Sequence, residues 1–556
     1  MIGLVAVTVA GKVAAARLAA SWPGQTRTYQ GPAARALSQC WAECDAIVCF
    51  LAAGAVIRLI APLLEGKRSD PAVVCVDEAG RYVVALLGGH AGGANGLAAR
   101  TAEVLGAEPV ITTATDASGL PGLDTLGWPA EGAVAAVTRA MLDGQQVALS
   151  CDAIWPLPAL PVSPGGSGSY RIVVTDRIVP MDDRIVVLRP PSLVAGVGAS
   201  RGVTAGEVLD LLDETLTAAG LSSASVVAMA TADVKADEPG LLTAASERGW
   251  PLLTHPAATL AAVPVPTPSP AVLAAVGTPS VAEAAAILSA GELAVAKRKS
   301  ARATVAIGRI RPRGRLAVIG LGPGAPDLVS PRAVEELRRA SVVVGLDRYV
   351  DQIRHVLRPG TRVLATGLGA EEARARSALE QARAGHAVAL IGSGDAGVYA
   401  MASPTLAEAG SELDVTVVPG ITASLAAAAL LGAPLGHDHA IISLSDLHTP
   451  WDVIERRIRA AAEGDFVTVF YNPRSRARDW QLSAALAILA GHRPPSVPAG
   501  VVRNASRPGQ QVTITTLADI DVCAVDMLSV VIVGASTTRY VAGRMVTPRG
   551  YTWQPR

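Results

Sequence analysis

The feature that most constrains the fold of this chain is a regular alternation of short β-branched runs with Ala/Leu-rich stretches of helical period. Strand-like runs lie at 3–9, 46–50, 72–76, 82–87, 109–113, 170–174, 184–189, 225–231 and 303–307. This alternation is typical of parallel or mixed sheets that are covered by helices. The sequence therefore predicts an α/β fold along its length.

The chain is too long for a single core, because 556 residues correspond to roughly three to four domains. A Pro/Gly/Ser-rich segment at 155–169 and a dense basic run at 295–315 indicate boundaries. A fresh strand begins at Leu316, so 308–315 is the predicted main linker. The predicted domains of this multidomain α/β chain are 1–125, 126–190, 191–310 and 316–556.

Composition argues against several classes of protein. The 48 basic and 48 acidic residues balance, whereas a nucleic-acid surface needs a basic excess. No uninterrupted apolar run reaches the length of about 18 residues that a membrane span needs. The apolar start Met1–Val9 lacks a basic flank, which predicts a buried strand rather than a signal peptide. The six cysteines show no metal-ligand spacing, so we expect no metal site and buried thiols in a reducing cytoplasm.

Three helix starts carry capping signals. Thr204 with Glu207, and Ser280 with Glu283, have the spacing of a capping box. Ser330 precedes a proline that would stand in the first helical turn. These signals describe the fold and not the function.

The second half of the chain contains a glycine-rich loop, Gly320–Gly324, between a strand and the helix capped by Ser330. Glycines let a backbone approach a ligand closely and present its amide groups. With Ala325 the loop also fits a GxGxxA dinucleotide motif, but the acidic residue expected about 20 positions later comes late, at Asp347. Taken alone, this loop leaves a nucleotide-binding interpretation open.

Three further motifs follow strands in order: Ile391–Tyr399 (IGSGDAGVY), Val418–Ser424 (VPGITAS) and Phe470–Arg474 (FYNPR). Together with the first loop they resemble the tetrapyrrole methylase family, over essentially all of 316–551. The strings at 432–438 (GAPLGHD) and 547–551 (TPRGY) resemble its precorrin-3B C17-methyltransferase branch. The resemblance implies a two-domain α/β fold, of the class III methyltransferase type, that binds S-adenosylmethionine between its domains.

Carried over by position, the cofactor contacts of that family fall on Pro323, Gly394, Asp395, Val398, Thr422, Ala423, Asn472 and Thr515. Tyr399 and Tyr471 flank these positions. The family loop often reads GPGDP, whereas this chain has Ala325 in place of the aspartate. If that aspartate takes part in catalysis in relatives, this chain does without it or uses Asp327.

The resemblance implies methylation of precorrin-3B, or of its cobalt form, at C17 with ring contraction to precorrin-4. A sulfonium methyl is already activated, so the enzyme mainly has to align donor and acceptor, and we assign no general base. Candidates for substrate contacts are His437, Asp438 and Asp446. Candidates for pairing with substrate carboxylates, which match a guanidinium fork, are Arg348, Arg474, Arg476 and Arg503. The family commonly dimerises, which implies a homodimer.

In the first half, a strand at 82–87 runs into the glycine-rich turn 88–95 (GGHAGGAN), which resembles an anion-binding turn. A second glycine-rich turn is predicted at 196–202, after a strand at 193–195. These strings, with 233–241 (DVKADEPGL) and 277–286 (GTPSVAEAAA), resemble cobalt-precorrin-5A hydrolase over roughly 1–310. That family opens a δ-lactone and releases acetaldehyde.

Hydrolysis requires an activated water and a stabilised leaving group. His90 is our candidate base, and Lys235 and Glu238, with Arg201, are candidates to orient or stabilise charge. The sequence therefore favours a bifunctional enzyme of corrin biosynthesis. Two alternatives stay open: a methyltransferase whose first half only binds corrinoids, and a non-enzymatic sensor.

Overall fold

The computed structural model describes residues 1–66, 69–89, 92–164, 168–367 and 369–551. The chain divides into two compact units. The first comprises Met1–Ile154, Leu160–Pro312 and Arg358–Gly360, and the second Trp155–Ala159, Arg313–Leu357 and Thr361–Arg556.

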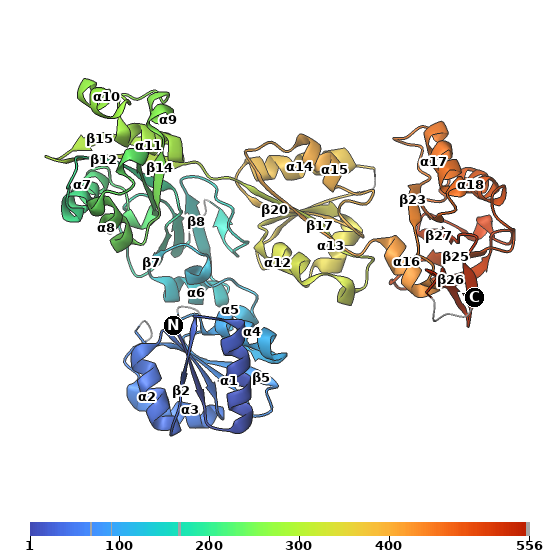
Figure 1. The fold of residues 1–556 in the computed structure, drawn as a ribbon, viewed down its shortest axis with the longest axis horizontal. Coiled ribbons are helices and arrows are strands. Elements are labelled where there is room, and N and C mark those ends of the chain that lie inside the picture. Colours follow the sequence, from blue (N-terminus) through green and yellow to red (C-terminus); the bar gives the residue numbers. More distant parts are fainter. Residues whose placement is uncertain (67–68, 90–91, 165–167, 368, 552–556) are drawn as a thin grey trace. The chain divides into compact units, whose positions relative to one another are not determined.

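The first unit begins with a six-stranded sheet in the order β2-β1-β3-β4-β5-β6, parallel except for the β4–β5 pair. Its strands are β1 (Ile2–Ala6), β2 (Thr26–Tyr29), β3 (Ala46–Phe50), β4 (Ala72–Val76), β5 (Tyr82–Leu87) and β6 (Glu108–Val110). Helices α1 (Val9–Ser21) and α4 (Ala94–Leu105) pack on one face, and α2 (Ala33–Glu43) and α3 (Ala53–Ile60) on the other (Figure 1). The predicted first strand is too long, because Thr8 accepts a hydrogen bond from Gly11 N and starts α1.

Cysteines contribute to the second of these faces. Cys40, Cys49 and Cys75 are buried between the sheet and its helices, and Cys44 lies beside them. Burial raises the pKa of the Cys75 thiol to about 11. These thiols are core residues, and no group of three or more metal-ligating side chains occurs within the described ranges.

A second sheet of the first unit has the order β7-β11-β10-β8-β9. It is formed by β7 (Ala130–Gly132), β8 (Val147–Cys151), β9 (Ser163–Pro164), β10 (Tyr170–Val174) and β11 (Ile185–Leu188), with α6 (Val134–Leu142) against it. The third sheet has the order β14-β13-β12-β16-β15. Its strands are β12 (Leu193–Ala199), β13 (Val226–Ala232), β14 (Leu252–His255), β15 (Gly291–Lys299) and β16 (Ala303–Ile310).

Helices cover both faces of the third sheet. The core on one face includes α7 (Ala205–Ala218) and α8 (Pro239–Arg248). The core on the other includes α9 (Ala257–Ala261), α10 (Pro270–Val276) and α11 (Val281–Ala290). Thr204 and Ser280 cap their helices as predicted, since they accept hydrogen bonds from Glu207 N and Glu283 N. The predicted capping boxes are not closed, because the Glu207 carboxylate accepts from Ser300 and Arg302 and the Glu283 carboxylate from Thr267 and Lys297.

The predicted glycine-rich turn at 196–202 is wrong in its first half, because β12 continues to Ala199. A Cβ on Gly196 would lie 2.0 Å from the Ala282 carbonyl oxygen of α11, and one on Gly198 would lie 2.6 Å from Thr304 Oγ1. Gly196 therefore lets α11 approach the strand closely, and Gly198 leaves room for Thr304 of β16. The turn itself begins only at Ser200.

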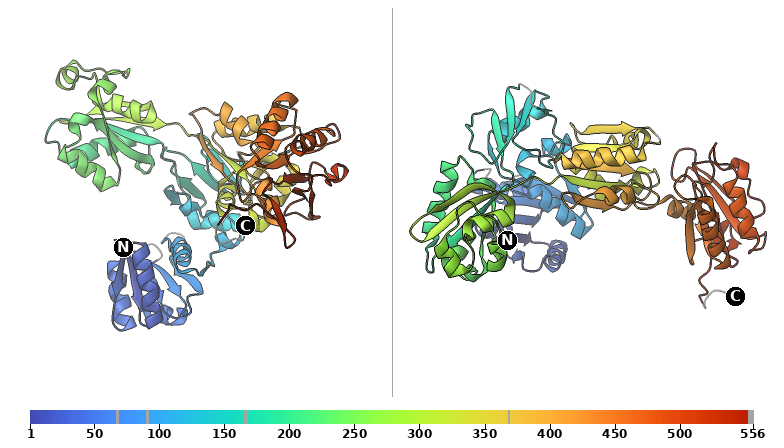
Figure 2. Two further views of the ribbon diagram at one scale, coloured as in Figure 1. Left: turned by 45° about the vertical axis from the view of Figure 1, so that its right-hand side comes forward. Right: turned by 90° about the horizontal axis from the view of Figure 1, so that it is seen from above.

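The second unit contains a five-stranded parallel sheet in the order β19-β18-β20-β17-β21. Its strands are β17 (Arg315–Gly320), β18 (Val342–Leu346), β19 (Arg362–Thr366), β20 (Ala387–Gly392) and β21 (Asp414–Val418). Helices α12 (Pro331–Arg339) and α13 (Asp347–Ile353) pack on one face, and α14 (Glu371–Arg383) and α15 (Ala402–Glu408) on the other (Figure 2). Ser330 caps α12 and Pro331 stands in its first turn, as predicted.

The last lobe of this unit has a mixed sheet in the order β23-β24-β27-β25-β26. It is formed by β23 (His439–Ser443), β24 (Val467–Tyr471), β25 (Pro498–Arg503), β26 (Gln511–Thr516) and β27 (Ser529–Val533). Helix α16 (Ala423–Leu431) packs on one face, and α17 (Trp451–Glu463) and α18 (Gln481–Ala490) on the other. Three short strands, β22 (Gly432–Ala433), β28 (Arg539–Val541) and β29 (Arg544–Val546), form a small separate sheet.

The predicted α/β fold is confirmed. In the described part of the chain no single helix is long and apolar enough to cross a membrane, although α10 and α11, a bent pair, would together meet that length and composition.

We expect Gly196→Ala to lower the stability of the first unit by about 1–3 kcal/mol, because the new methyl group would overlap the backbone of α11. Gly206→Ala is the matched control, since apart from its chain neighbours and the backbone of its own helix no atom lies within 4 Å of its Cβ position. There, alanine in a helix should stabilise by up to about 1 kcal/mol. Differential scanning calorimetry of both variants measures the difference, and equal transition midpoints would contradict the packing argument.

Candidate active sites

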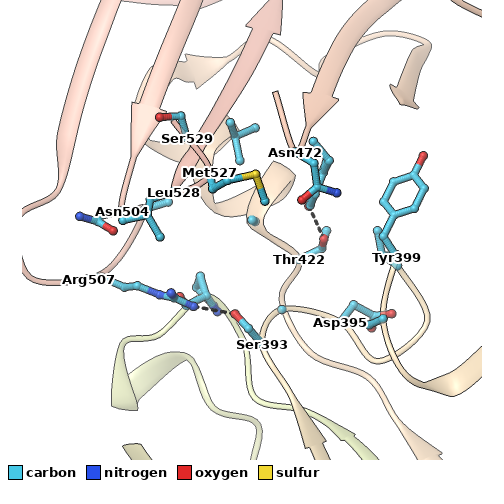
Figure 3. Close-up of a pocket in the computed structure, with 18 of the residues that line it drawn as sticks. Ser393, Asp395, Tyr399, Thr422, Asn472, Asn504, Arg507, Met527, Leu528 and Ser529 are labelled. Carbon is cyan, nitrogen blue, oxygen red and sulfur yellow. Dashed lines mark hydrogen bonds between the residues drawn. The ribbon is translucent and has the colours of Figure 1, made fainter. Parts of the chain in front are cut away.

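One pocket of the second unit lies where several strands of the parallel sheet end. Loops that follow β17, β20 and β21 meet there, because the carboxyl ends of parallel neighbours lie at one edge of a sheet. This edge is where open α/β sheets usually bind ligands. The pocket holds about 240 Å³ of free space, and residues from α16 and from the last lobe complete its walls (Figure 3).

At one side of the pocket, here called its floor, the two glycine turns around Gly322 and Gly394 contact each other directly through their backbones. Gly322 N donates to Gly394 O at 3.0 Å, and Gly394 N donates to Gly322 O at 2.7 Å. A Cβ on Gly320 would lie 2.6 Å from Gly394 O. The turns can therefore touch only because no side chain stands between them.

Asp395 links the turn around Gly394 to the loop that follows β21. One of its carboxylate oxygens accepts a hydrogen bond from Gly397 N at 2.8 Å, and the other accepts from Gly420 N at 3.0 Å. Both oxygens thus bond to the backbone, while the side chain still lines the pocket. Its observed role is to hold two loops in register.

Two tyrosines connect the pocket loops. The Tyr471 hydroxyl accepts from Ser424 N at 2.7 Å and bonds to Thr422 Oγ1 at 2.5 Å, so it caps the start of α16 from outside the helix. The Tyr399 hydroxyl donates to Ile441 O at 2.9 Å and accepts from Ser443 N at 3.1 Å. The two rings lie 5.6 Å apart. Together they tie the parallel-sheet lobe to the last lobe beside the pocket.

Strained backbone gathers at this site. Tyr399, Asn472 and Asn504 line the pocket and have φ values of 51°, 49° and 51°. Residues other than glycine adopt such angles at a cost, and they cluster at functional sites.

The structure brings most of the predicted cofactor residues together. Seven of the eight line this pocket: Pro323, Gly394, Asp395, Val398, Thr422, Ala423 and Asn472. Thr515 lies on β26, paired with Ala499, and is not part of the lining. Asp327 is exposed in a short 3₁₀ turn and also lies outside the lining. Their contact with a cofactor stays a prediction.

Most of the candidate substrate contacts lie elsewhere. His437 and Asp438 are exposed neighbours, and Asp446 accepts from Gln481 Nε2 at 2.8 Å. Arg503 pairs with Asp526 at 2.9 Å, and Arg474 donates to the carbonyl of Val522 at 3.2 Å. Arg476 is exposed, and of the four candidate arginines only Arg348 lines the pocket.

The sequence interpretation missed one wall of the pocket. It consists of Asn504, Ala505 and Arg507 after β25, and Met527 to Val530 at the start of β27. Arg507 Nε donates to Pro323 O at 2.5 Å, and its Nη2 donates to Ser393 Oγ at 2.6 Å (Figure 3). The polar turn 504–507 directly after a buried strand was the signal that marked this wall.

A second cluster lies in the first unit, at the carboxyl ends of the parallel pair β12 and β13. Glu238 is only 1% exposed, yet it carries a carboxylate. It accepts from Gly202 N at 2.7 Å and pairs with Lys235 at 3.4 Å and with Arg201 at 3.9 Å. The structure thus brings Lys235, Glu238 and Arg201 together, as the sequence suggested.

The third predicted catalytic residue, His90, lies outside the described residues. Around it, Gly88 O accepts from Ala94 N and Gly89 O accepts from Asn95 N, both at 3.0 Å, where the turn enters α4. The other histidine of this half, His255, ends β14 and bonds to Ser289 Oγ at 2.7 Å. Burial lowers the pKa of His255 below its ordinary value.

Comparison with known proteins gives three family matches. The model of the tetrapyrrole (corrin/porphyrin) methylases matches residues 315–521. The models of cobalamin synthesis G N-terminal and cobalamin synthesis G C-terminus match 35–116 and 193–308. The resemblances predicted for both halves are thereby confirmed.

Individual relatives match part of the chain. A probable cobalt-factor III C(17)-methyltransferase of Salmonella typhimurium is 49% identical over 43% of this chain and 99% of its own length. The precorrin-3B C(17)-methyltransferase of Sinorhizobium sp is 40% identical over 43% of this chain and 97% of its own length. The crystal structure of the methyltransferase CobJ has 41% identity, covers 42% of this chain and 100% of its own, and gives a TM-score of 0.41. Other relatives match over 45% to 53% of their own length.

We expect Glu238→Gln to destabilise the first unit by about 1–3 kcal/mol, because it leaves Lys235 without its buried partner. Asp237→Asn is the control: it removes an Arg201 partner that is 74% exposed, where such pairs contribute about 0–1 kcal/mol. Thermal unfolding of the full chain measures both. The ion-pair argument fails if the two variants unfold at the same temperature.

Proposed function

Because the chain belongs to the tetrapyrrole methylases, we propose that its second unit transfers a methyl group from S-adenosylmethionine to C17 of a precorrin-3B-type macrocycle, with ring contraction. The observation that carries this proposal is the convergence of seven predicted cofactor residues on one pocket. Its position at the carboxyl edge of the parallel sheet agrees with a ligand site.

The pocket suits the proposed cofactor in its chemistry. Apolar side chains of Val398, Met527 and Leu528 lie beside polar and charged ones, including Asp395 and Arg507. S-adenosylmethionine likewise combines a flat base with a ribose and a zwitterionic amino acid, and when bound it supplies an activated methyl group. We propose that Pro323, the turn around Gly394 and the start of α16 hold it.

The residues of the chain then mainly align the reacting groups. Tyr471 fixes the first turn of α16, and Tyr399 ties the two lobes beside the pocket. Such fixed positioning accelerates a reaction between groups that are already reactive. No general base is required for the methyl transfer in this proposal.

The macrocycle is proposed to carry cobalt. The relative that is 49% identical is named for cobalt-factor III, and the one that is 40% identical for precorrin-3B. A cobalt-bearing substrate would also place both halves of the chain in the same series of intermediates. Parallel assays with the cobalt-bearing and metal-free substrates test this point.

For the first unit we propose opening of the δ-lactone of cobalt-precorrin-5A with release of acetaldehyde. The family matches of this unit and the Lys235–Glu238 cluster at a sheet edge support it. Lys235 would stabilise developing negative charge, Glu238 would position Lys235 and Arg201, and His90 would act as base. The alternative is a first unit that only binds corrinoids.

We further propose the domain division 1–125, 126–190, 191–310 and 316–556, together with a cytoplasmic location and a homodimer. The location follows from the cysteine pattern, and the homodimer is carried over from the methylase family.

The bifunctional proposal predicts that each activity can be removed separately in the full chain. Tyr471→Phe should lower methyl transfer roughly tenfold, because two hydrogen bonds at the pocket are lost, and leave acetaldehyde release unchanged. Lys235→Met should abolish acetaldehyde release and leave methyl transfer unchanged. Radiolabel transfer and an acetaldehyde-coupled assay measure the two rates.

His90→Ala tests the proposed base in the same assays. Unchanged acetaldehyde release would remove His90 from the mechanism. If the unaltered chain releases no acetaldehyde from cobalt-precorrin-5A, the first unit is a binding module and the bifunctional proposal fails.

A further inference from the structure

Arg507 is a half-buried cation in the wall of the methylase pocket. Its Nε and Nη2 donate to Pro323 O and Ser393 Oγ, both on the parallel-sheet lobe, whereas Arg507 itself follows β25 of the last lobe. Both acceptors are neutral. Among the described residues, no carboxylate lies within 4.0 Å of its guanidinium nitrogens.

The neighbouring arginine shows the usual arrangement. Arg503, at the end of the same strand, pairs with Asp526 at 2.9 Å. A partly buried guanidinium loses part of its hydration and is normally compensated by an anion. Arg507 lacks that compensation within the described chain.

Donors remain available on Arg507. A guanidinium has five N–H groups, and the two hydrogen bonds of Arg507 use one on Nε and one on Nη2. The Nη1 and Nη2 atoms therefore still offer one fork that matches a carboxylate in two parallel hydrogen bonds.

The charges around the pocket also favour an anion. Arg348 and Arg507 line it, against a single lining carboxylate, Asp395. The oxygens of Asp395 already accept from Gly397 N and Gly420 N. The pocket thus has an excess of positive charge, which attracts a negative group.

The Gly-Pro-Gly loop that follows β17 leaves room for the Arg507 side chain. A Cβ on Gly324 would lie 2.6 Å from both Cγ and Nε of Arg507. Gly324 also has a φ of 138°, which favours glycine. The Gly-Pro-Gly loop therefore admits the arginine side chain between the two lobes.

We propose that Arg507 is the carboxylate-binding residue of this pocket. The inference rests on the proposed methyltransferase function and deepens it. The carboxylate is either that of the methionine part of the cofactor or that of a side chain of the tetrapyrrole. The two carboxylates have the same chemistry. They are distinguished by which ligand, the cofactor or the tetrapyrrole, binds more weakly when the Arg507 guanidinium is removed.

The test uses the full chain and the variants Arg507→Gln and Arg507→Lys, with Arg539→Gln as control. Arg539 is exposed on β28 and outside the pocket, so its change alters net charge by the same amount. Calorimetry measures binding of S-adenosylhomocysteine and of 5′-deoxy-5′-(3-aminopropylthio)adenosine, which keeps the amine and lacks the carboxylate. Steady-state assays give KM for the tetrapyrrole.

If Arg507 binds the carboxylate of the cofactor, Arg507→Gln should weaken the binding of S-adenosylhomocysteine roughly tenfold to hundredfold. The same variant should bind the decarboxylated analogue as tightly as the unaltered chain does. If Arg507 instead binds a carboxylate of the tetrapyrrole, the variant should bind both nucleosides as before. Its KM for the tetrapyrrole should rise by a similar factor while kcat stays constant. Either result supports the proposal, with Arg507→Lys intermediate because it keeps charge without the fork.

Equal behaviour of Arg507→Gln and Arg539→Gln would overturn the role of Arg507. So would an equal loss of both nucleosides with unchanged KM, which indicates a purely structural link between the lobes. In both cases, binding of S-adenosylhomocysteine by the unaltered chain leaves the proposed function standing. Absence of that binding would overturn the function and the inference together.

Discussion

The methylase pocket depends on the backbone contact between the turns that follow β17 and β20. Gly322 and Gly394 exchange two hydrogen bonds, and the path of the chain at Gly320 leaves no space for a Cβ. This contact fixes the positions of the two turns, and with them the positions of Pro323 and Asp395 in the pocket lining. The last lobe can then approach close enough for Tyr399 to bond to Ile441 O and for Arg507 to bond to Pro323 O. A side chain at Gly320 would press on the Gly394 carbonyl, separate the loops and remove the later contacts.

At both candidate sites, a carboxylate holds two segments of the backbone together. Asp395 joins two loops through backbone N–H groups, and Glu238 joins the turn at Gly202 to the residues before α8. Charge-assisted hydrogen bonds to backbone amides are stronger than neutral ones, so one carboxylate can hold a loop that has few apolar contacts. The same side chains had been singled out in the sequence for their chemistry. Their geometry shows that positioning is at least part of what they do.

Local signals in the sequence were sufficient for the element order and for most of the pocket floor. Capping residues such as Thr204 and glycine motifs such as Gly394 act through their own neighbours, so their roles can be read from short strings. Arg507 and the turn of Glu238 depend on partners 184 and 36 residues away, which no local pattern specifies. Gly196 shows the opposite error: it suggested a turn, but the glycine admits a helix against a strand.

The buried ion pair of the first unit bears on whether that unit is catalytic. Glu238 is 1% and Lys235 is 12% exposed, so both lose hydration on folding. Apolar residues of similar volume often stabilise a protein as well as a buried ion pair does. A domain that only had to fold would gain little from this pair. A domain that must stabilise negative charge on a leaving group needs a cation held in place, and Glu238 supplies that restraint. The cluster therefore favours a first unit that presents a cation to a negatively charged group over one in which the pair is only structural.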